Sequence, residues 1–196
     1  MSDRLSLYAV TAPGMETITA GELTRLGLPF SEAEPGGVSF EGTLADLALA
    51  NLWLRTASRV LLRLGSFHAR ALGELERKAA LLPWREWLRP DFSMKIRATC
   101  RKSRLYHQQA VAERILSASG AAGEVDGAEE VEASEAQLVV VRLWRDECTV
   151  SLDSSGALLH RRGYRLASGK APLRESGDRA RPVPSRRGIR TGSPWP

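Results

Sequence analysis

One short segment of the chain concentrates side chains that could bind phosphate groups. Residues 99–107, TCRKSRLYH, contain three cationic residues together with a tyrosine and a histidine. Arginine and lysine side chains pair with phosphate oxygens, while an aromatic ring stacks on a base or contacts a ribose 2′-hydroxyl. The residue types therefore predict a contact with nucleic acid through Arg101, Lys102, Arg104, Tyr106 and His107. The alternative is a solvated basic turn that has no partner.

The elements around this segment would place two more cations beside it. FSMKIRATCR (92–101) alternates apolar and polar residues with the period of two that a half-buried strand shows. Its apolar residues then point inward, and Lys95 and Arg97 share the outward face. Residues 106–119, YHQQAVAERILSAS, follow as a helix. Lys95 and Arg97 therefore join the candidate RNA-binding residues, within a strand–turn–helix arrangement.

The remaining sequence shows little other chemistry. It contains neither a GxGxxG loop after a strand nor a GxxxxGK[ST] loop, and no HExxH or paired Cys/His spacing that would hold a metal. We therefore assign no catalytic residue, no metal and no cofactor to this chain. Cys100 and Cys148 lie far apart in strand-like runs, so we interpret them as buried thiols of a reduced, cytoplasmic protein. No apolar run approaches the roughly 20 residues of a membrane span, and no membrane partner is expected.

The net charge of +5 is distributed unevenly along the chain. Residues 160–196 hold ten of the 28 Lys and Arg but two of the 23 Asp and Glu, so this tail carries about +8 and the remaining body about −3. A nucleic-acid interface must then rest on local patches rather than on the overall charge. After residue 173 the tail has no apolar periodicity. We expect it to be disordered, because it cannot bury enough surface to offset the entropy of ordering.

The apolar periodicity predicts two small units that mix helices and strands. The first follows the order β-α-β-α-β, which is typical of a ferredoxin-like domain, and Thr43 would cap its second helix. The second unit ends in two strands joined by a hairpin at Asp146-Glu147. A run of three valines in the first of these strands indicates burial on both faces. Four of the five tryptophans are assigned to the core rather than to base-stacking platforms; they are Trp53, Trp84, Trp87 and Trp144.

Several sequence blocks resemble those of one enzyme family, in the family's order. They are ANLWLRTASRVLLRL, SRLYH, LDSSGALLHRRGYR and APLRE, and the similarity runs almost continuously over residues 5–175. On these blocks the chain resembles the N-terminal part of the bacterial THUMP-containing 23S rRNA guanine-N2-methyltransferases. The resemblance implies an α+β protein with a ferredoxin-like domain over residues 1–68. A THUMP RNA-binding domain, which is a mixed sheet with packed helices, would follow over residues 69–156. In the family's own domain division, the THUMP domain could instead begin near residue 43. A linker and basic tail would occupy residues 157–196.

The resemblance also implies partners. The expected partner is structured RNA, in this family 23S rRNA. Arg161 and Arg162 of the HRRGYR block would either contact its phosphates or belong to a linker that packs against a catalytic domain. The family's catalytic part is an S-adenosylmethionine-dependent methyltransferase that begins just after the APLRE block.

The chain departs from the family pattern after that block. It continues with SGDRARPVPSRRGIRTGSPWP, which we interpret as a frameshifted reading near codon 175. We therefore expect an RNA-binding module for rRNA processing that does not methylate by itself. Two alternatives remain: one half of a split methyltransferase whose catalytic domain is separately encoded, and a folded remnant without a function.

Overall fold

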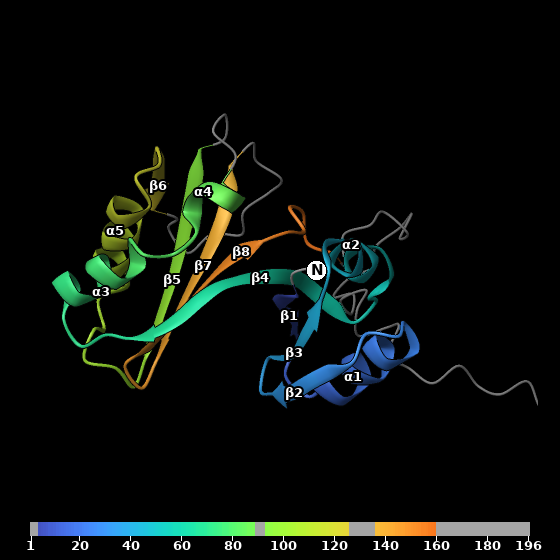
Figure 1. Ribbon diagram of the computed structural model, residues 1–196. Helices are drawn as coiled ribbons and strands as arrows, with labels where there is room; N and C mark the ends of the chain where they lie inside the picture. The colour runs from blue at the N-terminus through green and yellow to red at the C-terminus, as the bar shows by residue number, and fades with distance from the viewer. Residues whose placement is uncertain (1–3, 89–92, 126–135, 160–196) are drawn as a thin grey trace, which may run out of the picture.

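The computed structural model describes residues 4–88, 93–125 and 136–159 (Figure 1). Over these residues the chain forms one mixed sheet of eight strands in the order β2-β3-β1-β4-β8-β7-β5-β6. The long strand β4 arches between a first wing, which holds β1 to β3, and a second wing, which holds β5 to β8 (Figure 1). The elements in chain order are β1 (Leu5–Thr11), α1 (Glu16–Arg25), β2 (Phe30–Glu34), β3 (Gly37–Gly42), α2 (Leu44–Trp53), β4 (Ala57–His68), α3 (Leu72–Ala79), α4 (Trp84–Trp87), β5 (Met94–Arg101), α5 (Gln108–Ser119), β6 (Gly123–Val125), β7 (Gln137–Trp144) and β8 (Glu147–Asp153).

The first wing is ferredoxin-like, as the sequence predicted, but it contains one strand more than expected. Together with the first half of β4, its element order is β-α-β-β-α-β, and β2, β3, β1 and β4 pair antiparallel throughout. The additional strand is β2, which lies at the edge of the sheet. The sequence of β2, FSEAE, shows no buried apolar face, because four of its five residues are exposed. An alternation rule therefore could not find it.

The second wing combines parallel and antiparallel pairing. Strand β5 pairs parallel with both β7 and β6, whereas the hairpin β7–β8 is antiparallel and β8 pairs antiparallel with β4. The hairpin was predicted, but its two central residues are Arg145 and Asp146, one position earlier than expected. Both have positive φ, 52° and 66°, which is the backbone conformation of a type I′ turn. The mixed sheet confirms the predicted α+β class.

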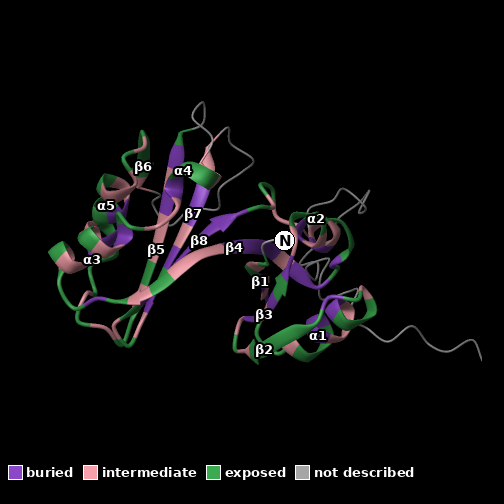
Figure 2. Ribbon diagram, in the orientation of Figure 1, coloured by how far each residue is buried: buried purple, intermediate pink, exposed green. Residues whose placement is uncertain are grey.

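Buried apolar side chains of both wings lie on one face of the sheet. Leu62, Leu152 and Val139 are neighbours across β4, β8 and β7, and all three are buried (Figure 2). The prediction that the valine run is buried on both faces is wrong, because Val140 on the opposite face is half-buried and Arg142 is exposed. That opposite face is open at this point. None of the described helices is both long and apolar enough to span a bilayer.

Two of the four tryptophans assigned to the core lie there. Trp84 is buried and donates its indole N–H to the carbonyl oxygen of Ala79 at 2.8 Å, and the half-buried Trp87 packs against the core. Trp144 is half-buried at the end of β7, where Lys102 and Arg145 lie over its ring. Trp53 departs from the prediction, since 63% of its surface is exposed. It is the last residue of α2 and projects from the outer side of that helix.

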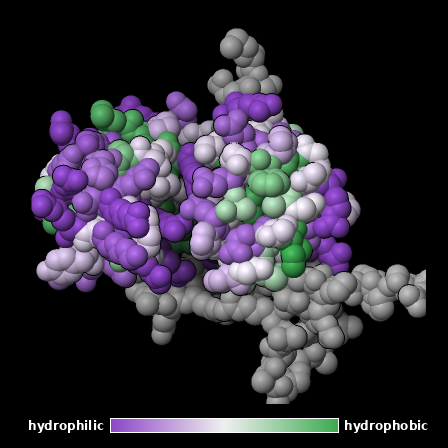
Figure 3. Space-filling model, turned by 90° about the horizontal axis from the view of Figure 1, so that it is seen from below, coloured by the Kyte–Doolittle hydropathy of each residue, from purple (hydrophilic) through white to green (hydrophobic). Residues whose placement is uncertain are grey.

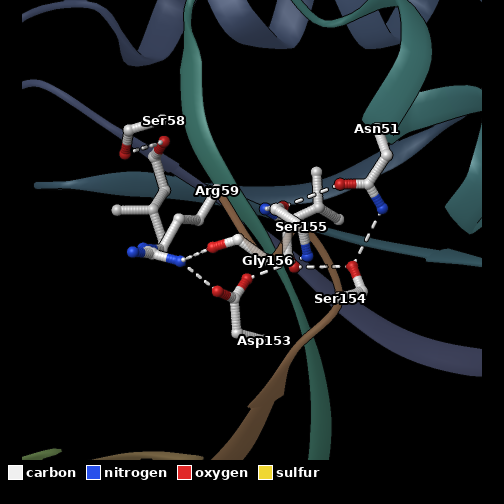
Figure 4. A network of polar contacts seen from close by, with 9 residues as sticks. Asn51, Ser58, Arg59, Asp153, Ser154, Ser155 and Gly156 are labelled. Carbon is white, nitrogen blue, oxygen red and sulfur yellow. Dashed lines mark hydrogen bonds and ion pairs between the residues drawn. The ribbon is translucent and has the colours of Figure 1, made fainter. Parts of the chain in front are cut away.

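A polar network fastens the end of β8 to the first wing (Figure 4). The carboxylate of Asp153 pairs with the guanidinium of Arg59, and both residues are buried. Arg59 also donates to the carbonyl oxygen of Gly156 at 2.9 Å. Ser155 donates its hydroxyl to the side-chain oxygen of Asn51 on α2 at 2.7 Å. The N–H of Leu159 then bonds the carbonyl oxygen of Ser58 at 2.9 Å, so the chain leaves the described part beside α2.

Candidate nucleic-acid interface

The predicted basic turn lies at the carboxyl end of β5. The strand ends at Arg101, and α5 begins after His107, which occupies the N-cap position. The backbone of Lys102 has a positive φ of 51°, which turns the chain sharply away from the sheet. Arg101, Lys102 and Arg104 are all exposed, so the turn presents its three cations to solvent.

Two further turns meet the basic turn at the same end of the second wing. One joins β4 to α3 and carries Arg70, and the other is the β7–β8 hairpin, which carries Arg145. All three turns lie at the lower left of Figure 1. We call this group of cations the basic end; it consists of Arg70, Arg101, Lys102, Arg104 and Arg145. Sequence reasoning missed Arg70 and Arg145, which approach β5 only through the strand order.

Asp146 joins the three turns. One carboxylate oxygen accepts the backbone N–H of Arg104 at 2.7 Å, and the other pairs with Nε of Arg70 at 3.3 Å. The backbone of Asp146 donates to the hydroxyl of Ser103 at 3.0 Å and accepts the N–H of Ala69 at 2.8 Å. Its side chain is only 16% exposed, so the carboxylate is occupied by these internal contacts. Asp146 thereby fixes the relative position of segments that carry cations.

Aromatic rings accompany the cations. The indole of Trp144 lies 5.0 Å from the ammonium of Lys102 and 5.8 Å from the guanidinium of Arg145, within cation–π range. Tyr106 is 69% exposed, and its ring centroid lies 4.1 Å from that of His107. These rings could stack on unpaired bases beside the phosphates.

The local charge of the basic end is positive, although the body of the chain is slightly negative. The three turns, residues 68–71, 101–107 and 144–147, contain five Lys or Arg and two acids, Asp146 and Glu147. Seen from below, the surface of the second wing, at the left of Figure 3, is mostly hydrophilic. Three turns from distant parts of the sequence thus form a basic surface with exposed aromatic rings, which suits the backbone of a nucleic acid.

The remaining predicted residues lie elsewhere. Lys95 is at the start of β5, about 20 Å from Arg101 along the strand by the usual rise per residue, and pairs with Glu124 at 3.6 Å. Arg97 lies half-buried between them. Arg161 and Arg162 fall outside the described residues, as does the predicted tail from residue 160 onward. The structure therefore groups five of the nine predicted residues: Arg101, Lys102, Arg104, Tyr106 and His107.

Two arginines on the open face of the sheet are held by internal contacts. Glu34 of β2 pairs with Arg63 of β4 at 3.2 Å and with Arg142 of β7 at 3.9 Å, which links the two wings. The guanidinium of Arg63 stacks 4.5 Å above the ring of Tyr8. Burial, and next the charge of Glu34, raise the pKa of Tyr8. We therefore do not include Arg63 and Arg142 in the basic end.

The described residues offer little for a metal or for nucleophilic chemistry. Among them, no group of three His, Cys, Asp or Glu side chains could hold a metal ion. Burial, and next the nearby Cys100, raise the pKa of the Cys148 thiol to about 12, and burial also raises the pKa of Cys100. Neither thiol is therefore activated as a thiolate at neutral pH.

Comparisons with known proteins agree with this architecture. Residues 6–61 match the model of the RlmL ferredoxin-like domain, and residues 69–153 match the THUMP domain. A protein of Synechocystis sp. named as a candidate RNA methyltransferase is 34% identical over 172 residues, which are 86% of this chain and 45% of that protein. The ribosomal RNA large subunit methyltransferase K/L of Psychromonas ingrahamii is 34% identical over 175 residues, 88% of this chain and 23% of that enzyme.

A solved structure supports the same assignment. A crystal structure from Listeria monocytogenes, described as a predicted N6-adenine-specific DNA methylase, superposes with a TM-score of 0.78 at 35% identity. The match covers 89% of this chain and 47% of that protein. The chain thus spans less than half the length of each of these relatives.

Proposed function

From the premise that this chain carries the ferredoxin-like and THUMP domains of the THUMP-containing rRNA methyltransferase family, we propose that it binds structured RNA through the basic end. The observation that carries the proposal is the meeting of three turns, each with at least one cation, at the single residue Asp146. A solvated basic turn would need no such support from two other segments.

The basic end suits recognition of an RNA backbone rather than of a base sequence. Its cations would contact phosphates, and Tyr106 and Trp144 would stack on bases that are splayed out of a helix. Because the charge is local, binding would weaken steeply with salt and would require the RNA to approach from this end of the second wing.

We propose large-subunit ribosomal RNA as the class of RNA bound. The support is the similarity to the Psychromonas enzyme, whose name states that substrate. In proteins of that length a methyltransferase domain would use S-adenosylmethionine to transfer the methyl group. The residues of this chain include no glycine-rich loop for that cofactor, so we assign no step of the transfer to them. Their role would be to hold the RNA for the catalytic domain.

Charge reversal at the basic turn tests the proposal. The variant R101E/K102E/R104E should lower the affinity for large-subunit rRNA fragments by at least about tenfold, and reduce the slope of log K against log salt by roughly 2 to 3, because each lost phosphate contact removes close to one unit. The matched control is R25E/R55E/R85E, which changes the net charge equally at three exposed arginines away from the basic end. Both variants retain the arginine-rich tail, so a contribution from the tail cancels in the comparison.

Fluorescence anisotropy between about 50 and 200 mM salt measures both the affinity for the RNA and the salt dependence of that affinity. Equal loss of affinity in the two variants would show that only overall charge matters, and would remove the basic end from the binding site. Unchanged affinity in the basic-turn variant would have the same consequence.

A further inference from the structure

Helix α2 has an outer side made entirely of apolar residues. Its sequence, LADLALANLW, contains two polar residues, and both are used internally. Asp46 closes a capping box with Thr43, and Asn51 bonds Ser155. The inner side packs Leu47 and Ala50 into the core, and the half-buried Leu49 packs against it. The exposed residues form what we call the outer face of α2: Leu44, Ala45, Ala48, Leu52 and Trp53.

The outer face is accessible along its whole length. Leu44, Leu52 and Trp53 are 62%, 68% and 63% exposed, and Ala45 and Ala48 are also exposed. Positions 44, 48 and 52 are spaced by four residues and form one row on the helix surface. A single exposed leucine requires no explanation. A helix that is apolar on every side, however, is typical of a buried helix, and a continuous exposed row marks an interaction surface.

The place where the chain leaves the second wing identifies the partner. The network of Figure 4 fixes residues 153–156 against β4 and α2, and Leu159 bonds Ser58, five positions after the end of α2. In Figure 1 the orange end of the described chain lies next to α2. Whatever follows residue 159 in a longer protein therefore starts beside the outer face of α2.

We infer that the outer face of α2 is the docking surface for the methyltransferase domain that follows this region in a longer form of the chain. The domain would contribute an apolar patch of its own that covers the row formed by Leu44, Ala48 and Leu52. The similar proteins named above as methyltransferases or methylases are more than twice as long as the part that this chain matches. Their additional length is where the domain that docks on this surface would lie.

The location of this surface is compatible with RNA binding. Helix α2 lies at the upper right of Figure 1, and the basic end lies at the lower left. A domain that docks on α2 leaves the basic end open. The inference does not rest on RNA binding, since it would hold even if the basic end had no ligand.

Thiol labelling of α2 tests the inference. Ala48→Cys places a thiol in the middle of the outer face, and Glu113→Cys places a control thiol on the exposed side of α5. Each cysteine substitution is made in two proteins. One is the 196-residue chain, and the other is a chimera in which residues 1–175 of this chain replace the matching region of the full-length Listeria monocytogenes relative. Maleimide labelling at pH 7 is followed by mass spectrometry, with the parent proteins as the background for the two native thiols.

The expected result is fast labelling of both thiols in the 196-residue chain. In the chimera, Ala48→Cys should label at least about tenfold more slowly, as expected for a group that reacts only on local opening, while Glu113→Cys is unchanged. Equal rates at Ala48→Cys in the two proteins would overturn the inference. Slow labelling of Ala48→Cys in the 196-residue chain would also overturn the inference. If that slow rate depends on protein concentration, a second copy of the chain covers the outer face. If it does not, the chain's own tail covers it.

A second measurement uses the 196-residue chain alone, in case the chimera does not fold. L44E/A48E adds two carboxylates at exposed positions in the first turns of α2, where they also favour the helix dipole. The melting temperature should stay within about 2 °C of the parent, as for most exposed substitutions. A drop of about 5 °C or more would show that the outer face is already buried within this chain, and would refute the docking surface.

Discussion

Replacing Asp153 by alanine should be among the most damaging single substitutions in the described part of the chain. The side chain of Asp153 is 1% exposed and that of Arg59 is 9% exposed. The other carboxylate oxygen accepts the backbone N–H of Ser155 at 3.0 Å. Without the carboxylate, the guanidinium of Arg59 stays buried and keeps its hydrogen bond to the carbonyl oxygen of Gly156 at 2.9 Å.

The magnitude follows from the burial of both charges. Removing one partner of a buried ion pair costs about 3–5 kcal/mol, because the remaining charge is neither solvated nor paired. For a chain of this size, that loss lowers the melting temperature by about 6–20 °C. Replacing both partners by apolar residues, as in R59M/D153L, should cost far less than the sum of the single substitutions, since no uncompensated charge then remains.

Urea unfolding, followed by circular dichroism, measures the free energy of unfolding of each variant. The matched control is Glu41→Ala, which removes an ion pair with Arg4 whose side chains are 59% and 70% exposed. That pair should contribute less than about 1 kcal/mol. Equal losses for Asp153→Ala and Glu41→Ala would refute the reasoning, and so would strictly additive effects in the Arg59–Asp153 cycle.

Three further predictions follow from local geometry. Gly37→Ala would place a Cβ 2.5 Å from both a backbone carbonyl oxygen and the ring of Tyr8, so it should lower the free energy of unfolding in urea by about 1–3 kcal/mol. Gly73→Ala, with open space around it, should not lower it, and equal losses of stability in the two variants would contradict this prediction. The pKa of Asp46 is lowered because the backbone N–H and then the hydroxyl of the N-cap residue donate to its carboxylate. Its stabilisation should be complete above the ordinary value of 3.8 and lost as the pH falls below it, so the acid limb of the stability–pH curve should flatten in Asp46→Asn. The thiol of Cys148, with its pKa raised to about 12, should resist iodoacetamide at pH 8 until urea unfolds the chain, and modification of the native protein would show that the thiol is accessible.

The sequence predicted those elements whose signals are local. The alternation in β5 and the capping threonine before α2 both appear in the structure where they were expected. The hydroxyl of Thr43 accepts the backbone N–H of Asp46, and the backbone N–H of Thr43 donates to the Asp46 carboxylate, so the contact joins residues three apart. By contrast, β2 was missed because an edge strand can be polar on both faces, and the burial of Trp53 was overestimated because its residue type says nothing about the direction in which it points.

The candidate site could be predicted only in part for a similar reason. Arg101, Lys102 and Arg104 are adjacent in sequence, so their clustering was visible at once. Arg70 and Arg145 join them only because β8 and β7 lie between β4 and β5 in the sheet, an order that no local pattern contains. The role of these residues in RNA binding stays a prediction.

The sequence by itself determined the class of the protein, its likeness to the RNA-methyltransferase family, the main helices and strands, and one basic turn. These properties depend on the spacing of apolar residues and on the types of neighbouring residues. Each element has a fixed period of side-chain directions, about 3.6 residues in a helix and 2 in a strand, so both can be recognised in the sequence. Only the tertiary structure decided that Asp146 holds three turns together and that the outer face of α2 is exposed. Both depend on which strands pair and which helix faces pack, and these choices are made by contacts between residues 42 to 104 positions apart.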